Sequence, residues 1–496
     1  MRNLIIRRPD SVLLLLAGYF ALQFVVRLIM PDAMRYDEAQ QAFFSQWMVQ
    51  GYDSQPPLYN WIQAAFVSVF GLSMASIAFV KAVALVLLYA SHYRLARELL
   101  TDKLFAALST LSLMTIPQIF WEAQRDLTHS VALVICINLF LLAAIRTIKA
   151  PSTFLYAMLG LTAGLGMISK YNFALVFFGT FVAVALNPDW RSRLFDRRIL
   201  ISALVGILVV LPHGLWLIDN LSIASGKTLS IMAQEAPENA LAKLLQGPLR
   251  FLRIVLVILA PLVAVYVFAF RQELVRSLRQ STQWTRFFEH FFLTVILTIL
   301  LLILTIGMTA LRDRWLMPFV ALVPIWLCLK LQASAVRPSD YAQRLLIVPL
   351  IVMCLAPIAL VLRTNAPQLF GSYQAYNMPY GDFLERVIAE EGRRPGLMLA
   401  DNWLVAGNLH LQMPDVPAMA IVYDHLNAAY QWTAEKPILL VWLGGDGSAV
   451  PKSLTSWLDQ KGTAYRLGEA RLIDLPFQHS FNEEKARFGY AWVYPR

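Results

Sequence analysis

Two adjacent carboxylates, Asp37 and Glu38, follow Arg35 and precede a Pro56-Pro57 turn, in a polar stretch that comes directly after an apolar one. A carboxylate can take a proton from a hydroxyl group as a general base, and it can also hold a divalent cation. A structural explanation exists as well, because Asp37 is a favourable N-cap and Glu38 suits the positive end of a helix. The combination with Arg35 and the proline turn favours a functional role.

A second polar group lies at residues 121–130, which read WEAQRDLTHS between two apolar segments. If a helix begins here, Arg125 and His129 lie one turn apart on the same face. Two structural alternatives stay open. Arg125 and Asp126 can form an ion pair that merely ends a helix, and His129 can be an interfacial histidine without a chemical role.

Cations that could meet a phosphate group occur at three further places. Lys170 and Tyr171 lie between two apolar runs, where a charge costs a few kcal/mol unless it is paired or reaches the lipid headgroups. Arg312 and Arg314 carry guanidinium groups, whose geometry matches phosphate, and His213 lies near the end of another apolar run. Carboxylates and cations of this kind, gathered at one membrane face, suit chemistry on a lipid-linked phosphate substrate.

Long apolar segments must position these residues. The chain has 496 residues, of which 58% are hydrophobic and 15% charged, whereas soluble proteins have about 45–50% apolar residues. This composition excludes a soluble enzyme, a disordered chain and a collagen-like fibre. We predict about eleven membrane-spanning helices, at residues 11–30, 73–91, 104–121, 128–146, 153–169, 171–187, 199–217, 250–270, 291–309, 315–332 and 344–362.

The connections between these segments alternate in charge, and Lys and Arg gather in every second one. The positive-inside rule places the basic connections in the cytoplasm, so that the polar groups above face outward. Residues 363–496 contain 12 basic and 14 acidic residues, a balance of −2, so residues 1–362 carry +12 and the whole chain carries +10. The positive charge therefore reports membrane topology and does not indicate nucleic-acid binding.

The predicted architecture is an α-helical polytopic membrane domain, residues 1–362, followed by an outward-facing α/β domain, residues 363–496. The membrane domain includes an outer loop, residues 31–72, with two interfacial helices, one at 37–50 and one that opens at Pro56-Pro57. In the second domain we expect strands at 397–400, 418–422 and 437–442, and helices at 382–391, 402–411 and 453–460. This domain either caps the site and contacts the acceptor or is purely structural.

The order of these features resembles the GT-C-type glycosyltransferases: an N-terminal span, Asp37-Glu38, an amphipathic helix and the Pro-Pro-Leu-Tyr turn at 56–59. Among them the chain is most similar to bacterial relatives of the dolichyl-phosphate-mannose protein mannosyltransferases. The closer likeness is to the lipid A and lipopolysaccharide-core galacturonosyltransferases of rhizobia, with the lipid A aminoarabinose transferase more distant. It rests on residues 55–59, 125–130 and 166–171 and covers roughly residues 10–220.

The resemblance implies an inverting transferase at the periplasmic face of the bacterial inner membrane. It would move one sugar, galacturonic acid or another hexose or pentose, from undecaprenyl or another polyprenyl phosphate to lipid A, lipopolysaccharide core or another glycan. Asp37 matches the essential first-loop carboxylate, as general base or orienter of the acceptor, and Asp126 matches the supporting second-loop acid. The candidates for donor phosphate and substrate binding are Arg35, Glu38, Gln55, Arg125, His129, Lys170, Tyr171, His213, Arg312 and Arg314.

One departure from the aminoarabinose transferases concerns a cofactor. Those enzymes have Glu-Lys before the Pro-Pro pair, whereas this chain has Ser54-Gln55. The carboxylate that helps to hold a metal and the lysine that meets the phosphate are both missing there. The departure weakens the case for a divalent cation (Mg²⁺ or Mn²⁺), for which Asp37 would be the ligand, and for aminoarabinose as the sugar. The expected partners are the donor, the acceptor and membrane lipids, with the protein a monomer.

Two other function classes remain as alternatives. A flippase or transporter for a lipid-linked sugar should carry ionisable groups near the bilayer midplane and often has repeated halves. Here Lys81 is the plausible midplane charge, and we find no internal repeat. An oligosaccharide ligase or polymerase usually has a large loop between spans, whereas the large soluble piece of this chain is at its C-terminus.

Overall fold

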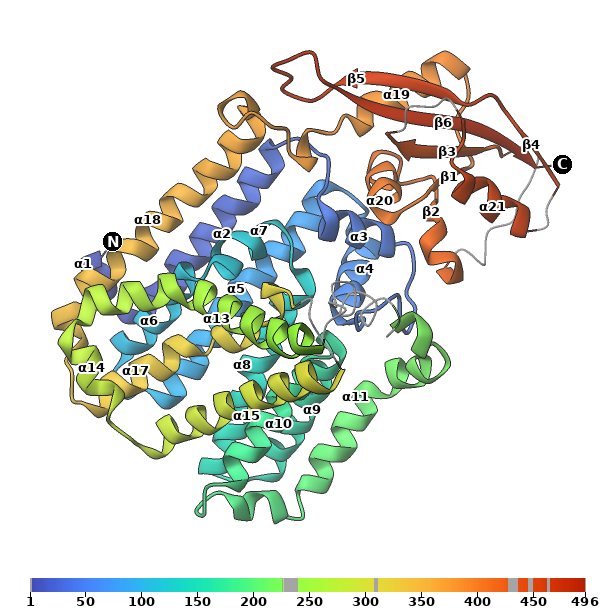
Figure 1. Cartoon of the computed structure of the whole chain (residues 1–496). Coiled ribbons are helices and arrows are strands. Elements are labelled where there is room, and N and C mark those ends of the chain that lie inside the picture. The colour runs from blue at the N-terminus through green and yellow to red at the C-terminus, as the bar shows by residue number, and fades with distance from the viewer. Residues whose placement is uncertain are drawn as a thin grey trace. The chain divides into compact units, whose positions relative to one another are not determined.

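The computed structural model describes residues 2–224, 226, 240–306, 311–426, 436–444, 449–461 and 464–495. The chain is helical up to Asn365 and then becomes a mixed segment with a sheet (Figure 1). Seven described helices are long and apolar enough to cross a membrane. They are α2 (Val12–Ile29), α5 (Met74–Leu99), α8 (Thr128–Lys149), α11 (Ile199–Asp219), α13 (Ala240–Phe270), α15 (Gln283–Ile306) and α18 (Pro338–Asn365). The protein is therefore a multi-pass helical membrane protein.

The other predicted spans correspond to broken or shorter helices. The span expected at 104–121 is a helix pair, Lys103–Thr115 and Gln118–Arg125, bent by 77°. The bend lies next to Pro117, which has no backbone N–H to continue a helix. Three others are α9 (Thr153–Ser169), α10 (Phe173–Ala185) and Met317–Ala333, which α16 (Met317–Val320) and α17 (Val323–Ala333) share. The end of the span expected at 291–309 lies outside the described residues, and the total of eleven stays a prediction.

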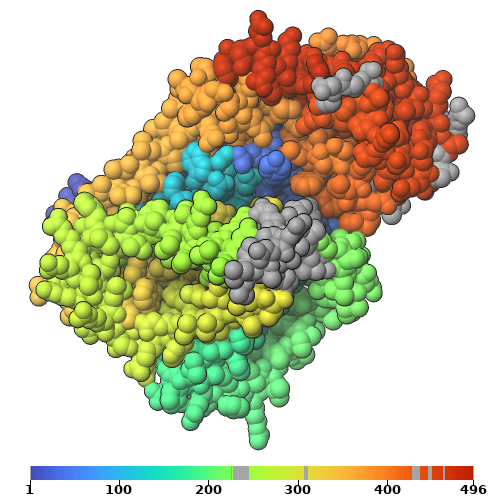
Figure 2. Space-filling model, in the orientation of Figure 1, coloured from blue at the N-terminus to red at the C-terminus, as the bar shows by residue number. Residues whose placement is uncertain are grey.

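Exposed apolar side chains are frequent on three of the spanning helices. Large apolar residues are exposed along α11, α13 and α15, among them Leu204, Leu256 and Leu297. Side chains of these helices lie on the surface shown in green to yellow in Figure 2. A soluble protein seldom exposes apolar surface on this scale, whereas the outer surface of a helix in a lipid bilayer is normally apolar.

The chain folds into two compact units, each assembled from segments that are separate in the sequence. Unit 1 comprises Met1–Ala21, Gln50–Tyr59 and Ala82–Ala356, and unit 2 comprises Leu22–Val49, Asn60–Lys81 and Pro357–Arg496. Unit 2 thus joins parts of the first outer loop to the C-terminal segment. The linear boundary at residue 362 stays a prediction.

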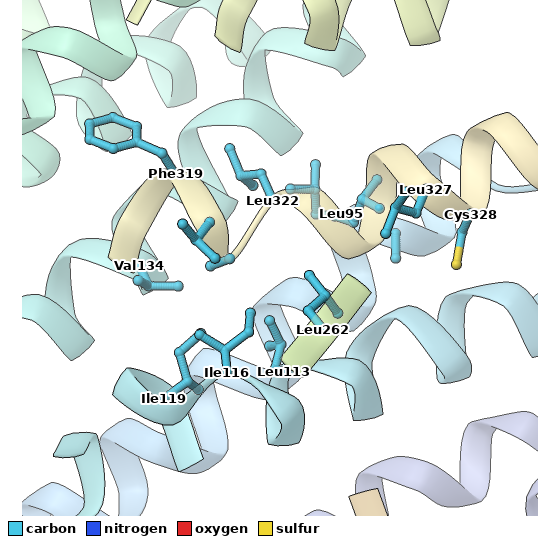
Figure 3. Close-up of a cluster of buried hydrophobic side chains, with 14 of the residues drawn as sticks. Leu95, Leu113, Ile116, Ile119, Val134, Leu262, Phe319, Leu322, Leu327 and Cys328 are labelled. Carbon is cyan, nitrogen blue, oxygen red and sulfur yellow. The ribbon is translucent and has the colours of Figure 1, made fainter. Parts of the chain in front are cut away.

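The core of unit 1 is a continuous cluster of aliphatic and aromatic side chains. Figure 3 shows part of this cluster, including Ile116, Val134, Leu262 and Leu322, all of which are almost fully buried. These residues come from helices and helix breaks far apart in the sequence. The cluster therefore fixes the helices that carry the polar groups of unit 1.

Small residues let α9 and α11 approach closely, as in many membrane helix pairs. A Cβ atom on Gly160 would lie 2.2 Å from the carbonyl oxygen of Ser202, and one on Gly164 would lie 2.7 Å from the Cβ of Val209. The obstacle at Gly160 is backbone, which no rotamer change can move. Glycine is therefore required there by packing.

We expect Gly160→Ala to lower the free energy of unfolding by about 1–3 kcal/mol, because the added methyl group must push α11 away. Thermal unfolding of the purified protein in detergent measures this change. Gly18→Ala is the matched control, since a Cβ atom on Gly18 would meet no atom of the described residues within 4 Å. Equal unfolding midpoints for the two variants would contradict the packing argument.

Unit 2 contains a mixed six-stranded sheet. Its order is β2-β1-β3-β6-β4, and β5 also pairs with β6. The strands β1 (Leu397–Ala400), β2 (Ala418–Ala420) and β3 (Ile438–Leu443) are parallel, and β6 (Lys485–Pro495) runs antiparallel to β3, β4 (Tyr465–Leu467) and β5 (Arg471–Pro476). The helices are α19 (Tyr380–Glu391), α20 (Trp403–Gln412) and α21 (Lys452–Gln460). The three predicted strands and three predicted helices are present within two residues at each end, whereas β4 to β6 were not predicted.

Candidate active site

The carboxylate pair of the first outer loop lies in the first turn of α3 (Tyr36–Phe44), in unit 2. The prediction that Asp37 is the N-cap was wrong, since Arg35 occupies that position and makes no side-chain cap. Asp37 instead lies inside the first turn, where the unpaired N–H groups of the helix still favour a negative charge. Its side chain is partly exposed. The helix is also shorter than the predicted 37–50, because it ends at Phe44.

Glu38 has a different environment from its neighbour. It is 2% exposed, and both of its carboxylate oxygens accept hydrogen bonds at 3.1 Å from the guanidinium group of Arg27. Arg27 also donates to the carbonyl oxygens of Pro31 (2.8 Å) and Ala33 (2.9 Å), and it lies 4.8 Å from the ring centre of Tyr376. These contacts account for Glu38 as a structural residue that fixes the start of α3, while its predicted role in substrate binding stays a prediction.

Breaking this ion pair from one side should destabilise the protein strongly. Glu38→Ala leaves the buried charge of Arg27 without its partner, which we expect to cost about 3–5 kcal/mol. The double variant Arg27→Met, Glu38→Met should recover much of that loss, because no charge then stays buried. Thermal unfolding in detergent checks both expectations.

An exposed ion pair in the same unit provides the control. Arg386 and Glu390 are 54% and 39% exposed and lie 2.9 Å apart, so Glu390→Ala should cost only about 0.2–0.5 kcal/mol. A loss for Glu38→Ala as small as this would show that the Arg27–Glu38 pair is not essential to unit 2.

The second outer loop, in unit 1, is a break between two helices. A π-helical turn, η3 (Gln118–Glu122), leads into α7 (Ala123–Arg125), and α8 starts at Thr128. The prediction that Arg125 and His129 lie one turn apart on a single helix was therefore wrong. Between the helices Leu127 adopts a left-handed conformation with φ of 66°, which costs a residue other than glycine about 1–3 kcal/mol and often accompanies functional sites. Asp126 lies directly before it and is buried.

Arg125 is buried beside this break. Its guanidinium group is 3.5 Å from the carboxylate of Glu122 and 5.1 Å from the ring centre of Trp121. Gln118, in the same π-helical turn, donates to the carboxylate of Asp313 at 3.0 Å. The broken span is thus tied to the segment that carries Arg312 and Arg314.

A second helix break, between α9 and α10, carries Lys170 and Tyr171. The ammonium group of Lys170 donates to the hydroxyl of Ser130 at 2.8 Å, in the first turn of α8. The Tyr171 hydroxyl and Nε2 of His213 are 3.0 Å apart. The amide of the next residue, Asn172, donates to the carbonyl oxygen of Trp315 at 3.2 Å. Both breaks therefore lie beside each other and beside residues 313–315.

The segment Gln50–Tyr59 closes this group from another side. Nδ1 of His213 is 2.9 Å from the carbonyl oxygen of Gln50. A Cβ atom on Gly51 would lie 2.2 Å from the ring of Trp216, so glycine is needed for the segment to pass α11. Tyr59, at its end, has its ring centre 6.1 Å from that of His129.

Asp53 is a buried carboxylate in this segment that was not predicted from the sequence. It is 5% exposed, accepts a hydrogen bond from the backbone N–H of Gln55 at 2.9 Å, and is near enough to His129 and Tyr171 to interact with both electrostatically. Asp53 lies three residues before Pro56 and directly before Ser54-Gln55, where the sequence differs from the aminoarabinose transferases. This position could have indicated Asp53 as a candidate.

The predicted site residues fall into two groups. In unit 1 the structure brings together Gln55, His129, Lys170, Tyr171 and His213, with Arg125, Asp126, Arg312 and Arg314 on adjoining turns. Unit 2 holds Arg35, Asp37 and Glu38. Among the described residues, the guanidinium groups of Arg312 and Arg314 have no hydrogen-bond or ion-pair partner, and both side chains are at least partly exposed. They are therefore available to an anionic ligand.

Known proteins are similar to this chain in sequence and in fold. The family described as dolichyl-phosphate-mannose-protein mannosyltransferase matches residues 54–216, which include the second outer loop and both helix breaks. Lipopolysaccharide core galacturonosyltransferase RgtB of Rhizobium johnstonii is 36% identical over 98% of both chains. The chain belongs to the GT-C-type membrane glycosyltransferases. This membership confirms the resemblance found in the sequence and favours a transferase over a flippase.

Other relatives agree with this assignment. RgtA of the same organism, also a lipopolysaccharide core galacturonosyltransferase, is 36% identical to this glycosyltransferase over 97% of both chains. Lipid A galacturonosyltransferase RgtD is 27% identical over 42% of this chain and 43% of its own. The crystal structure of ArnT from Cupriavidus metallidurans bound to undecaprenyl phosphate has a TM-score of 0.59 at 13% identity, with 96% of this chain and 97% of ArnT covered. The last comparison establishes the GT-C fold.

The metal requirement of this glycosyltransferase stays a prediction. Among the described residues, no group of three or more His, Cys, Asp or Glu side chains lies close enough together to hold a metal ion. In unit 1 the carboxylate of Asp53 lies near the imidazole of His129, and one carboxylate with one imidazole are fewer ligands than a divalent cation takes. We therefore assign no step of the reaction to a metal.

Proposed function

We propose that this glycosyltransferase moves a single galacturonic acid residue from a polyprenyl-phosphate donor, such as undecaprenyl phosphate, to lipopolysaccharide. The core oligosaccharide is the favoured acceptor and lipid A is the second. The observation that carries the proposal is the 36% identity to a lipopolysaccharide core galacturonosyltransferase over 98% of both chains. The donor class is supported by the ArnT structure, which has the same fold and is bound to undecaprenyl phosphate. We propose that it acts as a monomer in the bacterial inner membrane, with its site at the periplasmic face.

In the reaction we propose, Asp37 is the general base. It takes the proton of an acceptor hydroxyl, whose oxygen attacks the anomeric carbon from the face opposite the phosphate. The new bond joins the acceptor oxygen to the anomeric carbon, and the bond between that carbon and the phosphate oxygen breaks with its electron pair. Polyprenyl phosphate leaves, and the anomeric configuration inverts.

Cations in unit 1 would stabilise the charge that develops on the leaving phosphate. Lys170, Arg312 and Arg314 are the groups we assign to it, because charge-assisted hydrogen bonds to phosphate are about twice as strong as neutral ones. Asp126 supports the loop that precedes His129. The guanidinium groups of Arg312 and Arg314, which have no hydrogen-bond or ion-pair partner among the described residues, favour an anion most clearly.

Mass spectrometry of lipopolysaccharide tests this proposal. The gene is expressed in a Gram-negative strain that makes the lipid-linked galacturonic acid donor but lacks its own core and lipid A galacturonosyltransferases. We expect the core, or lipid A, to gain the mass of one hexuronic acid, and we expect no gain with Asp37→Asn. A gain of a hexose, of a pentosamine or of a whole oligosaccharide would overturn the proposal, the last in favour of a ligase.

A further inference from the structure

Helix α3 of the first outer loop packs directly against α20 of the C-terminal segment, within unit 2. A Cβ atom on Gly407 of α20 would lie 2.0 Å from the carbonyl oxygen of Ala39, so the two backbones touch. Met34, Ala39 and Ala42 form one apolar cluster with side chains of α20. These apolar contacts hold the two helices together, but they are not directional, so they do not fix the position of one helix along the other.

The amide of Asn408 prevents sliding before the start of α3. Asn408 is fully buried, and its Oδ1 accepts a hydrogen bond from the backbone N–H of Met34 at 2.7 Å. Its Nδ2 donates to the carbonyl oxygen of the same residue at 3.2 Å and to that of Leu404 at 2.8 Å. One side chain thus pairs with both backbone groups of Met34, three residues before Asp37, as a neighbouring strand would.

The amide of Gln46 makes the reciprocal contact after the end of α3. Its Nε2 donates to the carbonyl oxygen of Ala418 at 2.9 Å, and its Oε1 accepts from the N–H of Ala418 at 2.9 Å. Ala418 begins β2, the edge strand of the sheet, whose outer backbone groups have no strand beside them among the described residues. A third contact lies between, where the amide of Gln40 donates to the Tyr423 hydroxyl at 3.2 Å.

We propose that Asn408 and Gln46 are positioning residues, which fix α3 on the C-terminal sheet domain so that Asp37 stands in register for catalysis. Each side-chain amide makes two hydrogen bonds to the backbone of one residue, as a donor in one and an acceptor in the other. The two contacts lie before and after the helix that carries Asp37. Displacement of a reacting group by about 1 Å can cost roughly 10²-fold in rate. The C-terminal domain therefore serves the reaction as the support of the base. The link to catalysis rests on the proposed role of Asp37, whereas the link to loop order does not.

Hydrogen–deuterium exchange of the purified full-length protein in detergent tests the structural half. In Asn408→Ala and Gln46→Ala we expect amides of residues 33–45 to exchange at least about tenfold faster, with α8 and α13 unchanged. Asn377→Ala is the matched control. Asn377 is equally buried and makes three hydrogen bonds, but its partners Thr364, Gln374 and Gln478 all belong to the C-terminal segment.

Kinetics test the catalytic half. We expect Asn408→Ala and Gln46→Ala to lower kcat per folded molecule about 10- to 100-fold with little change in KM for the donor, and Asn377→Ala to leave both unchanged. In an Asp37→Glu background, where the carboxylate is already displaced, Asn408→Ala should lose much less than it does alone.

Three results overturn the inference. They are unchanged exchange in residues 33–45, an effect of Asn377→Ala equal to that of Asn408→Ala, and losses that simply multiply with Asp37→Glu. If residues 33–45 exchange faster but the losses of kcat from Asn408→Ala and Asp37→Glu multiply, the C-terminal domain holds α3, and the effect on catalysis does not act through Asp37. Loss of activity on Asp37→Asn alone bears on the proposed function and not on this inference.

Discussion

Asp37→Asn is expected to abolish sugar transfer while leaving the amount of folded protein unchanged. The amide has the size of the carboxylate but cannot take a proton, and loss of a general base typically costs about 10²–10⁴-fold in rate. A larger loss would mean that Asp37 also positions a substrate. The measurement is kcat of the purified variant with donor and acceptor in excess, normalised to folded protein.

Asp32→Asn is the control for this prediction. Asp32 is an exposed carboxylate of the same loop that accepts a hydrogen bond from Gln412 at 2.8 Å. The amide oxygen of the variant can still accept this bond, so we expect near-normal activity. Full activity of Asp37→Asn, or an equal loss in both variants, would refute the role of Asp37 as the base.

Lys170→Ala is expected to reduce kcat/KM for the donor roughly 10- to 100-fold, because a charge-assisted hydrogen bond contributes about 1.5–3 kcal/mol. Lys170 reaches the first turn of α8 through Ser130, and it lies near enough to His129 to interact electrostatically. Lys170→Arg keeps the charge and should retain part of the activity. The measurement compares kcat and KM for the donor in both variants.

Lys103→Ala is the matched control for a lost lysine. Lys103 is 53% exposed and pairs with Asp10 at 3.1 Å, an exposed arrangement that contributes about 0–1 kcal/mol. We expect unchanged kinetics for this variant. Equal losses for Lys103→Ala and Lys170→Ala would remove Lys170 from the donor site.

Much of the fold could be predicted from the sequence, because the length of an apolar run is enough to indicate a membrane span. The same argument cannot locate breaks inside a run, which depend on local backbone geometry. Leu127, in its left-handed backbone conformation, separates α7 from α8. Leucine does not favour that conformation, so the sequence does not indicate it. Strand β5 could have been found, since its residues alternate between exposed and buried. Strand β6 was harder to recognise, because Gly489 interrupts the run of large side chains in its sequence, at the point where the ring of Trp442 leaves no room for a Cβ atom.

The residues of the candidate site could be predicted from the sequence, but which of them contact one another could not. Glu38 was interpreted as a substrate contact, although Arg27 inside an apolar span is a charge that requires a partner, and the structure pairs the two. Asp53 was overlooked because its burial beside His129 and Tyr171 arises from contacts between distant segments. Sequence spacing identifies residue types suited to chemistry, whereas the fold decides which of them are engaged in structure.

The central claim, transfer of one galacturonic acid residue with inversion, is tested most directly by reconstitution. Purified protein is incubated with polyprenyl-phosphate galacturonic acid and lipopolysaccharide core acceptor, and the product is analysed by mass spectrometry and NMR. We predict one added hexuronic acid per acceptor, one polyprenyl phosphate released per transfer, and an anomeric configuration opposite to that of the donor. A product with retained configuration, or movement of the donor across a bilayer without a new glycosidic bond, would contradict the account.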